Sequence, residues 1–406
     1  MKVIIVGAGL GGLSAAHCFA KSGCHVELFE RSPELHSRGG GISIRPSASR
    51  IMHTWGLEKD LESIAQRSPS VTFRNLESGD IASRTAVINA SEYPDWGTTR
   101  KAVIRMLYKN AISAGAHIHF GATVVNVSDD DKQATVTLAT GESIVGDIVL
   151  AADGVKSHIR PIILSDLDST QSLEPIVDQT TFYGCDVVAS DLTDDFESTS
   201  PKINRIGFLF AIQAETDQKT LWDEKGDIEH VRRFFSGSCR ELTKALRLTD
   251  SCDRWRLVEM PNLPRWSSKA GRVILVGDSA HAMHPNAAQG YSTTVEDIGV
   301  LDFLLARFAS ESRAPVSQVV KIWQAIRKPR VERIKDYANW NTQNFSGKGV
   351  ATPEQAEGKI IQTGKDVAPD MNADFDTAAF WKWSLDYDAI GEAQSALAAQ
   401  PKWPKL

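Results

Sequence analysis

The sequence has few cysteines, no long hydrophobic run and no excess of basic residues. Its 406 residues include five cysteines, an odd number, scattered without C-x-x-C spacing. This pattern favours buried thiols in a reducing compartment over a disulfide framework. No stretch approaches the roughly twenty apolar residues of a membrane-spanning helix. The net charge of −6 gives no reason to expect nucleic acid or an anionic membrane as a partner.

Neither end of the sequence carries a clear targeting signal. Glycines interrupt the apolar N-terminus within a few residues and no cleavage site follows, so we interpret this segment as structural. The terminal Pro404-Lys405-Leu406 lacks the serine of the peroxisomal Ser-Lys-Leu signal. We therefore expect a cytoplasmic globular protein, in which 42% of the residues are apolar and 24% are charged.

The first thirty residues predict a dinucleotide-binding unit. An apolar, β-branched run precedes Gly7, Gly9 and Gly12, and an Ala-rich helical run follows. In a G-x-G-x-x-G motif one glycine allows the tight turn, one allows a pyrophosphate to approach the backbone, and one allows the helix to pack closely. The N-terminus of the helix then faces the phosphates. Glu30 ends the next apolar run. In dinucleotide-binding units a carboxylate at this position accepts hydrogen bonds from the ribose. The alternative is a glycine turn in an ordinary βα unit.

The character of the sequence changes twice along the chain. Alternating strand candidates over 164–266 predict a substrate domain with a mostly antiparallel sheet, inserted into an α/β domain formed by 1–163 plus 267–346. A helical tail over 347–406 is expected to pack its aromatic residues against the body. The segment 318–344 predicts a helix kinked or started at Pro329, with its many Arg and Lys residues on a solvated face.

Three motifs follow one another along the chain, each at a predicted strand end. They are Gly7-x-Gly9-x-x-Gly12 with Glu30, then Asp153-Gly154-x-x-Ser157-x-x-Arg160, and then Gly277-Asp278-x-x-His281-x-x-x-Pro285. Together they resemble the single-component FAD-dependent aromatic hydroxylases, the group that includes salicylate hydroxylase and para-hydroxybenzoate hydroxylase. The resemblance covers roughly residues 1–333. It implies an α/β fold with a Rossmann-like FAD-binding domain, an interleaved antiparallel substrate domain and C-terminal helices.

The resemblance also implies which residues bind FAD. Glu30 would accept hydrogen bonds from the adenosine ribose and Asp278 from the ribityl chain. The stretch 285–290 would lie against the isoalloxazine, where the N-terminus of the following helix stabilises an anionic reduced flavin. The full assigned set is Gly7, Gly9, Gly12, Glu30, Arg31, Gly40, Gly41, Arg100, Val125, Asp153, Asp278, Pro285, Ala288 and Gly290.

In this family NAD(P)H docks transiently, reduces the flavin and leaves. The reduced flavin then binds O2 as a C4a-hydroperoxide, which transfers one oxygen atom to an electron-rich ring. The resemblance thus implies a monooxygenase that acts on an aromatic or electron-rich small molecule without a metal. We expect the protein to be a monomer or a homodimer. Epoxidation, oxidative decarboxylation and Baeyer–Villiger oxidation stay open on this scaffold. So do a reductase or dehydrogenase that does not use O2, and a non-enzymatic flavin redox sensor.

Three residues are candidates for contact with the substrate. His284 could remove a phenolic proton at neutral pH. Its spacing from His281 suggests a metal pair only weakly, because no third ligand follows. Tyr183 could hydrogen-bond a substrate or be a core tyrosine. Many relatives carry an aromatic-arginine pair on the first strand of the substrate sheet, and Cys185 stands where the arginine would be. Arg205, on the neighbouring strand, could supply a cation instead, or be a solvent-facing strand arginine.

Overall fold

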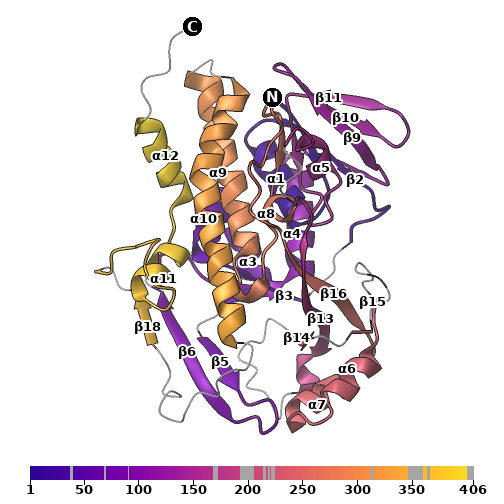
Figure 1. Cartoon of the computed structure of the whole chain (residues 1–406), viewed down its shortest axis with the longest axis vertical. Coiled ribbons are helices and arrows are strands. Elements are labelled where there is room, and N and C mark those ends of the chain that lie inside the picture. The colour runs from indigo at the N-terminus through magenta and orange to yellow at the C-terminus, as the bar shows by residue number, and fades with distance from the viewer. Residues whose placement is uncertain are drawn as a thin grey trace.

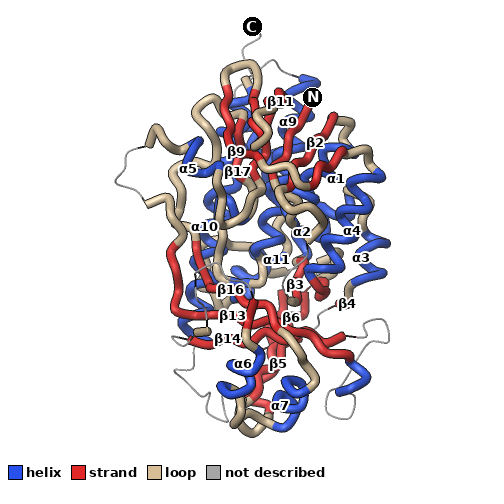
Figure 2. Tube along the Cα trace, turned by 90° about the vertical axis from the view of Figure 1, so that its right-hand side faces the viewer, coloured by secondary structure: helices blue, strands red, loops and turns tan. Residues whose placement is uncertain are grey.

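The computed structural model describes residues 1–36, 40–67, 70–89, 91–167, 172–192, 205–213, 216–217, 220, 225–311, 315–345, 360–363 and 366–399. Figure 1 names its helices and strands, and Figure 2 shows the molecule from the side. Among the helices of these residues, none combines the length and the hydropathy needed to cross a membrane.

A five-stranded parallel sheet forms the core of the larger part of the molecule. Its strand order is β17 (Val273–Leu275), β12 (Ile148–Ala151), β1 (Lys2–Val6), β2 (His25–Glu30) and β8 (His117–Phe120), and every neighbouring pair runs parallel. The side chains of β12 and β17 are buried throughout, which is typical of a parallel sheet covered on both faces. All these strands therefore end at one edge, where the three motifs of the sequence follow them.

Helices and a β-meander pack around this sheet. Helix α1 (Leu10–Lys21) contacts β1 and β2, and α4 (Arg100–Ser113) and α9 (Gly290–Glu311) contact α1. The meander contacts β1 and β12. Its strands are β9 (Val124–Asp129), β10 (Ala134–Leu138) and β11 (Ser143–Gly146).

A second, antiparallel sheet lies at the lower end of the molecule in Figure 1. Its strand order is β14 (Arg205–Gln213), β13 (Ile176–Val188), β16 (Cys252–Glu259) and β15 (Lys225–Gly226). Two helices, α6 (Ile228–Phe234) and α7 (Arg240–Arg247), pack against this sheet, and Figure 2 shows them below these strands. They cover one face of the sheet, which we call the helix face; we call the other the open face.

The remaining elements connect these parts. The hairpin β5 (Ser70–Arg74) and β6 (Ile81–Asn89) gains a parallel third strand, β18 (Ile360–Thr363), from the C-terminal region. The other small sheet consists of β3 (Gly41–Ile44), β7 (Trp96–Thr99) and β4 (Gln66–Arg67). The shorter helices are α2 (Pro46–Thr54), α3 (Glu58–Ile64), α5 (Ile159–Ile163), η1 (Ala189–Leu192), α8 (Asp278–His281), η2 (Pro285–Ala287), α11 (Ala378–Leu385) and α12 (Ala389–Ala399).

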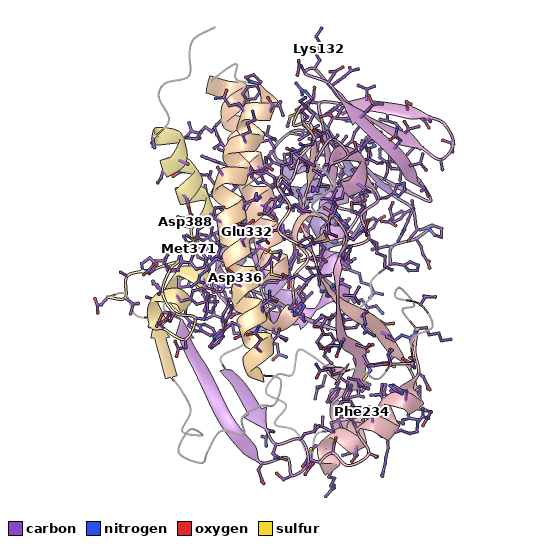
Figure 3. All side chains as sticks on the ribbon, in the orientation of Figure 1. Lys132, Phe234, Glu332, Asp336, Met371 and Asp388 are labelled. Atoms are coloured by element: carbon purple, nitrogen blue, oxygen red, sulfur yellow. The ribbon has the colours of Figure 1, made fainter. Side chains whose placement is uncertain are left out.

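Helix α10 (Val316–Phe345) corrects two expectations from the sequence. It does not start at Pro329 but runs through it as one helix of 30 residues. Its basic residues do not all lie on a solvated face, because Arg327, Arg330 and Lys335 are buried. The accessible side carries acidic as well as basic residues, among them Glu332 and Asp336, which are labelled in Figure 3.

The buried arginines of α10 pair with two adjacent acidic residues of α9. Arg327 Nε lies 2.7 Å from Asp297 Oδ1, and Arg327 Nη2 lies 2.7 Å from Glu296 Oε2. Arg330 Nη2 lies 3.0 Å from Glu296 Oε1. The four side chains are at most 2% exposed. We call them the α9–α10 charge cluster; its two positive and two negative charges balance.

The charge cluster also contacts the third motif and the C-terminal helices. Asp297 Oδ2 lies 2.6 Å from Nε2 of the buried His281 in α8. Arg330 donates a hydrogen bond of 2.8 Å to the carbonyl of Ser384, and its guanidinium lies 4.1 Å from the ring centre of Tyr387. One buried cluster thus connects α8, α9, α10 and the C-terminal helical segment.

Replacing Glu296 by Gln should strongly destabilise the protein. Burial alone would raise the pKa of Glu296, but the guanidinium groups of Arg330 and Arg327 lower it from 4.5 to about 2. Its charge therefore contributes fully to stability above about pH 4.5, and the contribution is lost as the pH falls toward 2. Breaking a buried pair from one side costs about 3–5 kcal/mol, so we expect a large drop in the urea midpoint at pH 7.

The matched control is Glu332→Gln on α10, whose carboxylate lies 3.7 Å from Lys328 near the surface. Exposed pairs contribute about 0–1 kcal/mol, so this midpoint should hardly move. If Glu296→Gln and Glu332→Gln had equal urea midpoints, the charge cluster would not contribute to the stability of the fold as proposed.

Candidate functional site

The glycine turn after β1 has the shape of a phosphate cradle. Gly7 has φ +101°, and a Cβ there would lie 2.6 Å from the Ala152 carbonyl oxygen. A Cβ on Gly12 would lie 1.8 Å from the Gly7 carbonyl oxygen. A Cβ on Gly9 would meet nothing within 4 Å, and Gly9 precedes α1, whose N-terminus has no side-chain cap and no acidic residue in its first turn. Open space and unpaired helix N–H groups fit the pyrophosphate of FAD.

Glu30 is held at the end of β2 by backbone N–H groups. Its carboxylate accepts hydrogen bonds from Ala8 N at 2.7 Å and from Ser32 N at 2.8 Å. Ala122 N donates to the Glu30 carbonyl at 2.9 Å, which brings the start of β9 to this edge; Val125, on β9, is 41% exposed. Arg31 is exposed beside Glu30. The residues assigned to the adenosine half of FAD thus lie at one end of the sheet.

The second and third motifs are joined by a buried arginine. Asp153 Oδ2 accepts hydrogen bonds from the N–H groups of His158 and Ile159, at 2.8 and 3.2 Å, and its Oδ1 is buried without a partner. The Arg160 guanidinium donates to the carbonyls of Ser279, at 3.0 Å, and Val155, at 3.0 Å. This arrangement positions the loop after β12 against the loop after β17.

The third motif places an exposed carboxylate directly after the turn at Gly277. Gly277 has φ +65°, and a Cβ there would lie 3.1 Å from the Thr294 side chain. This turn aims Asp278 outward as the first residue of α8, where it is exposed, while the next residue, Ser279, donates a 2.6 Å hydrogen bond to the Ala151 carbonyl. The placement of Asp278 suits an acceptor for ribityl hydroxyl groups.

The turn that leads into α9 is fixed from several sides. Ala288 is left-handed, with φ 50° and ψ 35°, and such backbone in a non-glycine residue costs about 1–3 kcal/mol. Its carbonyl accepts a 3.2 Å hydrogen bond from Arg45 Nε, and the buried Gln289 donates from Nε2 to Ser384 Oγ at 2.6 Å. Pro285 is exposed at the start of the turn and Gly290 begins α9.

His284 lies between α10 and the end of β16. Its Nδ1 is 3.2 Å from Thr342 Oγ1, and its Nε2 is 3.8 Å from Glu259 Oε2. The Thr342 hydroxyl donates its only proton to the Ala338 carbonyl at 2.8 Å, so toward His284 it can only accept. The hydrogen bonds therefore assign the proton of a neutral His284 to Nδ1 and leave the Nε2 lone pair on the side of Glu259.

The backbone of Gly40 and Gly41 lies against the open face of the second sheet. Cβ atoms on Gly184 and Gly207 would each lie 3.8 Å from the backbone nitrogen of Gly40 and Gly41, respectively. The Gly40 carbonyl accepts a 3.1 Å hydrogen bond from the N–H group of Arg100, which is exposed at the start of α4. The segment assigned to FAD by the resemblance thus borders the antiparallel sheet.

The structure corrects the placement of Tyr183. Its side chain is fully buried on the helix face, and its hydroxyl donates a 2.5 Å hydrogen bond to Asp217. Burial and this hydrogen bond raise the pKa of Tyr183 to about 12. Contact with a substrate would require an accessible hydroxyl, so Tyr183 is a core tyrosine in this structure.

The cation expected near the substrate is not identified by the described side chains. Arg205 begins β14 and pairs with Val188, but its side chain lies outside the described residues. Cys185 is buried on the helix face, where Thr249 Oγ1 lies 3.8 Å from its Sγ. An arginine in the register of Cys185 would therefore point away from the open face.

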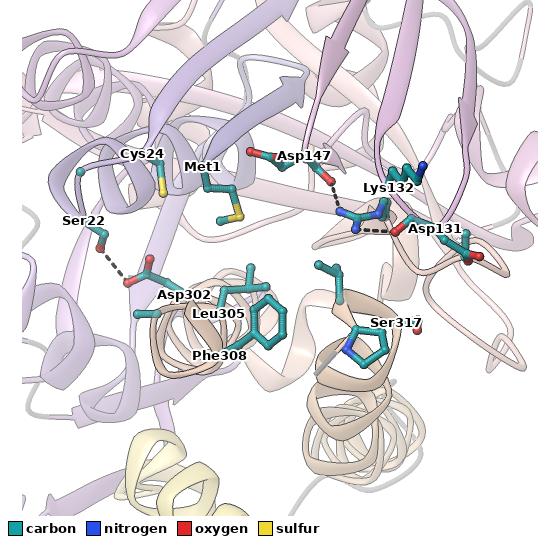
Figure 4. Close-up of a pocket in the computed structure, with 16 residues that line it drawn as sticks. Met1, Ser22, Cys24, Asp131, Lys132, Asp147, Asp302, Leu305, Phe308 and Ser317 are labelled. Carbon is teal, nitrogen blue, oxygen red and sulfur yellow. Dashed lines mark hydrogen bonds between the residues drawn. The ribbon is translucent and has the colours of Figure 1, made fainter. Parts of the chain in front are cut away.

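A cavity of about 880 Å³ lies elsewhere, where the parallel strands begin (Figure 4). Within it Arg272 donates to the carbonyls of Asp147 and Asp131 at 2.8 and 2.7 Å, and Ser22 donates to Asp302 at 2.8 Å. It lies at the opposite end of the sheet from the motifs and does not belong to the candidate site. The described residues contain no group of three or more His, Cys, Asp or Glu side chains suited to a metal ion.

Sequence analysis missed the supports of the site. An adjacent acidic pair, Glu296 and Asp297, among apolar positions that the helical pattern buries was the signal that could have revealed the charge cluster. No local signal marks Arg45 or Gln289, because their partners, Ala288 and Ser384, are set by tertiary contacts.

Comparison with known proteins decides the family, because residues 1–338 match the FAD binding domain family. The chain belongs to this family. It is 28% identical to the FAD-dependent monooxygenase OpS4 of Beauveria bassiana, over 98% of this chain and 97% of OpS4. It is 26% identical to 6-hydroxynicotinate 3-monooxygenase of Bordetella bronchiseptica, over 84% of this chain and 92% of that enzyme.

Solved structures share the fold. CtdE in complex with FAD and substrate 4 matches with a TM-score of 0.80 and 20% identity, over 98% of this chain and all of CtdE. A salicylate hydroxylase substrate complex matches with a TM-score of 0.73 and 20% identity, over 98% of both chains. The predicted family resemblance and α/β fold class are confirmed: the chain is an FAD-dependent monooxygenase, and NAD(P)H use is typical of its family.

Gly9→Ala should weaken FAD binding without affecting folding. The added Cβ meets no protein atom, but it projects from the residue before α1, where we expect the pyrophosphate to approach. We expect at least about a tenfold rise in the FAD dissociation constant, measured by quenching of flavin fluorescence. The control is Gly237→Ala, also in open space. Equal FAD affinity in both variants would remove Gly9 from the cofactor site.

Proposed function

We propose that this monooxygenase uses NAD(P)H and O2 to insert one oxygen atom into an aromatic or similarly electron-rich small molecule. The observation that carries the proposal is the contact between the Gly40–Gly41 backbone and the open face of the antiparallel sheet. This contact places a surface for a substrate directly beside a segment assigned to FAD. The chemistry supplied by bound FAD is two-electron oxidation of NAD(P)H and activation of O2.

We propose that the parts of the chain hold the cofactor as follows. The α1 N-terminus binds the pyrophosphate, Glu30 accepts from the adenosine ribose, and Asp278 accepts from the ribityl chain. Backbone N–H groups at the start of α9 would stabilise negative charge on the bound flavin. We also propose that the chain divides into three parts: residues 1–163 and 267–346 form the FAD domain, residues 164–266 form the substrate domain, and residues 347–406 form the helical tail.

We assign His284 the role of general base toward an acidic hydroxyl group of the substrate. Nδ1–H donates to Thr342, so Nε2 is the basic atom that accepts the proton. Glu259, 3.8 Å away, then stabilises the imidazolium. Removing the proton makes an oxygen-bearing ring more electron-rich and a better acceptor of an electrophilic oxygen atom.

The balanced reaction provides the test. Substrate, O2, NAD(P)H and a proton give the hydroxylated product, NAD(P)+ and water. With isotopically labelled O2 the product should carry one labelled oxygen atom, as measured by mass spectrometry. NAD(P)H oxidation without O2 uptake would favour a reductase or dehydrogenase. FAD binding without NAD(P)H oxidation, across a panel of phenols, indoles and purine-like rings, would favour a redox sensor.

His284→Ala should retain FAD but uncouple the reaction. The side chain contacts Thr342 and Glu259 and none of the phosphate-binding turns, so flavin content should stay near one per chain. Without the base, the two electrons of NAD(P)H should reduce O2 to H2O2 instead of supporting oxygen transfer to the substrate. We expect product per NAD(P)H to fall at least about tenfold, a barrier change of about 1.4 kcal/mol. An unchanged yield of product would exclude His284 as a catalytic residue.

A further inference from the structure

Ala288, in the turn that leads into α9, has a backbone conformation that its side chain disfavours. Among the residues that the structure describes, it is the one non-glycine residue with a positive φ. Asparagine and aspartate can stabilise the left-handed region through a local side-chain hydrogen bond, but alanine has no polar group for this. The conformation of Ala288 therefore persists only because neighbouring groups hold it.

Arg45 holds this turn from the end of β3. Its Nε–H group donates a hydrogen bond to the Ala288 carbonyl at 3.2 Å. Its backbone N–H group donates to Ser292 Oγ, in the buried first turn of α9, at 3.0 Å. The main chain of Arg45 is thus fixed against α9 independently of its side chain, so a substitution at this position removes only the side-chain contact with Ala288.

Asp95 fixes the direction of the Arg45 guanidinium. Ile44 pairs with Trp96 in the antiparallel ladder of β3 and β7, which makes Arg45 and Asp95 the next pair beyond the ladder. Arg45 Nη1 lies 2.6 Å from Asp95 Oδ2, and the two side chains are only 19% and 18% exposed. Because the guanidinium is planar, a partner at Nη1 also fixes the direction in which Nε–H points.

The conformation of Ala288 sets the direction of the N–H groups that follow it. The first N–H groups of a helix have no partner within the helix, and they stabilise negative charge only where they point at it. Rotation of the Ala288 backbone out of the left-handed region would turn the peptide groups between the turn and Gly290, where α9 begins. The Arg45–Asp95 pair therefore controls the aim of these groups.

We propose that Arg45 is a positioning residue for the flavin, which holds Ala288 in the left-handed region and so aims the N–H groups at the start of α9. This inference rests on the placement of the isoalloxazine against 285–290 under the proposed function. Arg45 acts through Ala288 and need not touch the flavin. Its effect is to make the flavin easier to reduce, because the aimed N–H groups stabilise the negative charge of the reduced form.

The first test is a double-mutant cycle between positions 45 and 288, measured as the two-electron reduction potential of the FAD-loaded protein without substrate. In Arg45→Lys a methylene group takes the place of Nε, while the ammonium group keeps the positive charge beside Asp95. With Ala288 present, the ratio of reduced to oxidised flavin should fall at least about tenfold, a shift of about 30 mV.

The Ala288→Gly background decides whether Arg45 acts through the turn. Glycine adopts the left-handed region without support, so in this background Arg45→Lys should change the ratio of reduced to oxidised flavin less than about threefold. Equal losses in both backgrounds, or no loss in either, would overturn the proposal.

The matched control is Arg265→Lys, at an equivalent arginine outside the flavin turn. Arg265 Nε–H donates to the Ser267 carbonyl at 2.8 Å, its guanidinium pairs with Asp166, and its side chain is 22% exposed. This variant should keep the reduction potential of the unchanged protein. An equal shift in Arg265→Lys and Arg45→Lys would overturn the specific role of Arg45.

The second test separates position from charge by the direction of the effect. Asp95→Ala removes a negative charge, which by itself favours the negatively charged reduced flavin. The substitution also releases the Arg45 guanidinium from its partner, so a positioning role predicts a flavin that is harder to reduce. A flavin that is easier to reduce would show that the pair acts through its charges and would overturn the proposal.

The outcome for Arg45 is separate from the outcome for the reaction, which is followed with labelled O2. The predicted coupling between positions 45 and 288, without labelled oxygen in any product, would contradict the proposed function and leave the role of Arg45 in place. Labelled product together with an unchanged reduction potential in Arg45→Lys would overturn only the positioning role.

Discussion

The pairing of two acidic and two basic side chains between α9 and α10 is the constraint on which the rest of the structure depends. Removing four charges from water is costly, and the cost is offset only when each charge has well-placed partners. Arg327 bridges Glu296 and Asp297, and Arg330 completes the set. Since either helix alone would leave buried charges unpaired, their relative position is fixed closely.

This fixed pair of helices determines the geometry of the turn over 285–290, the segment assigned to the isoalloxazine. The turn over 285–290 leads directly into α9, and His281, just before it, is held by Asp297. On its other side the C-terminal part of α10 supplies Thr342, which contacts His284, and Asn341, which donates a 2.8 Å hydrogen bond to the Asn286 carbonyl. The segment assigned to the isoalloxazine and the proposed base thus take their positions from the same two helices.

The sequence predicted the parts of the site that depend on local geometry. The turn glycines, Glu30 and Asp278 each follow a strand, and parallel strands end at one edge, so neighbouring motifs meet there. Long-range pairing could not be predicted in this way. Arg327 and Arg330 have the spacing of a solvated helix face, but the acidic pair of α9 and the C-terminal residue Tyr387 pack against them. Pro329 looks like a helix breaker, yet tertiary packing carries α10 through it.

The substrate sheet shows why single positions on a strand are hard to interpret from sequence. Successive side chains point to opposite faces, so an alignment error of one residue moves every assignment to the wrong side. Tyr183 and Cys185 share the helix face with the buried core, whereas Phe182 and Gly184 belong to the open face beside the loop assigned to FAD. A chemically attractive tyrosine therefore lies in the core. The face that borders the loop assigned to FAD is formed instead by residues without a recognisable catalytic signature, and only the register of the strands shows which residues these are.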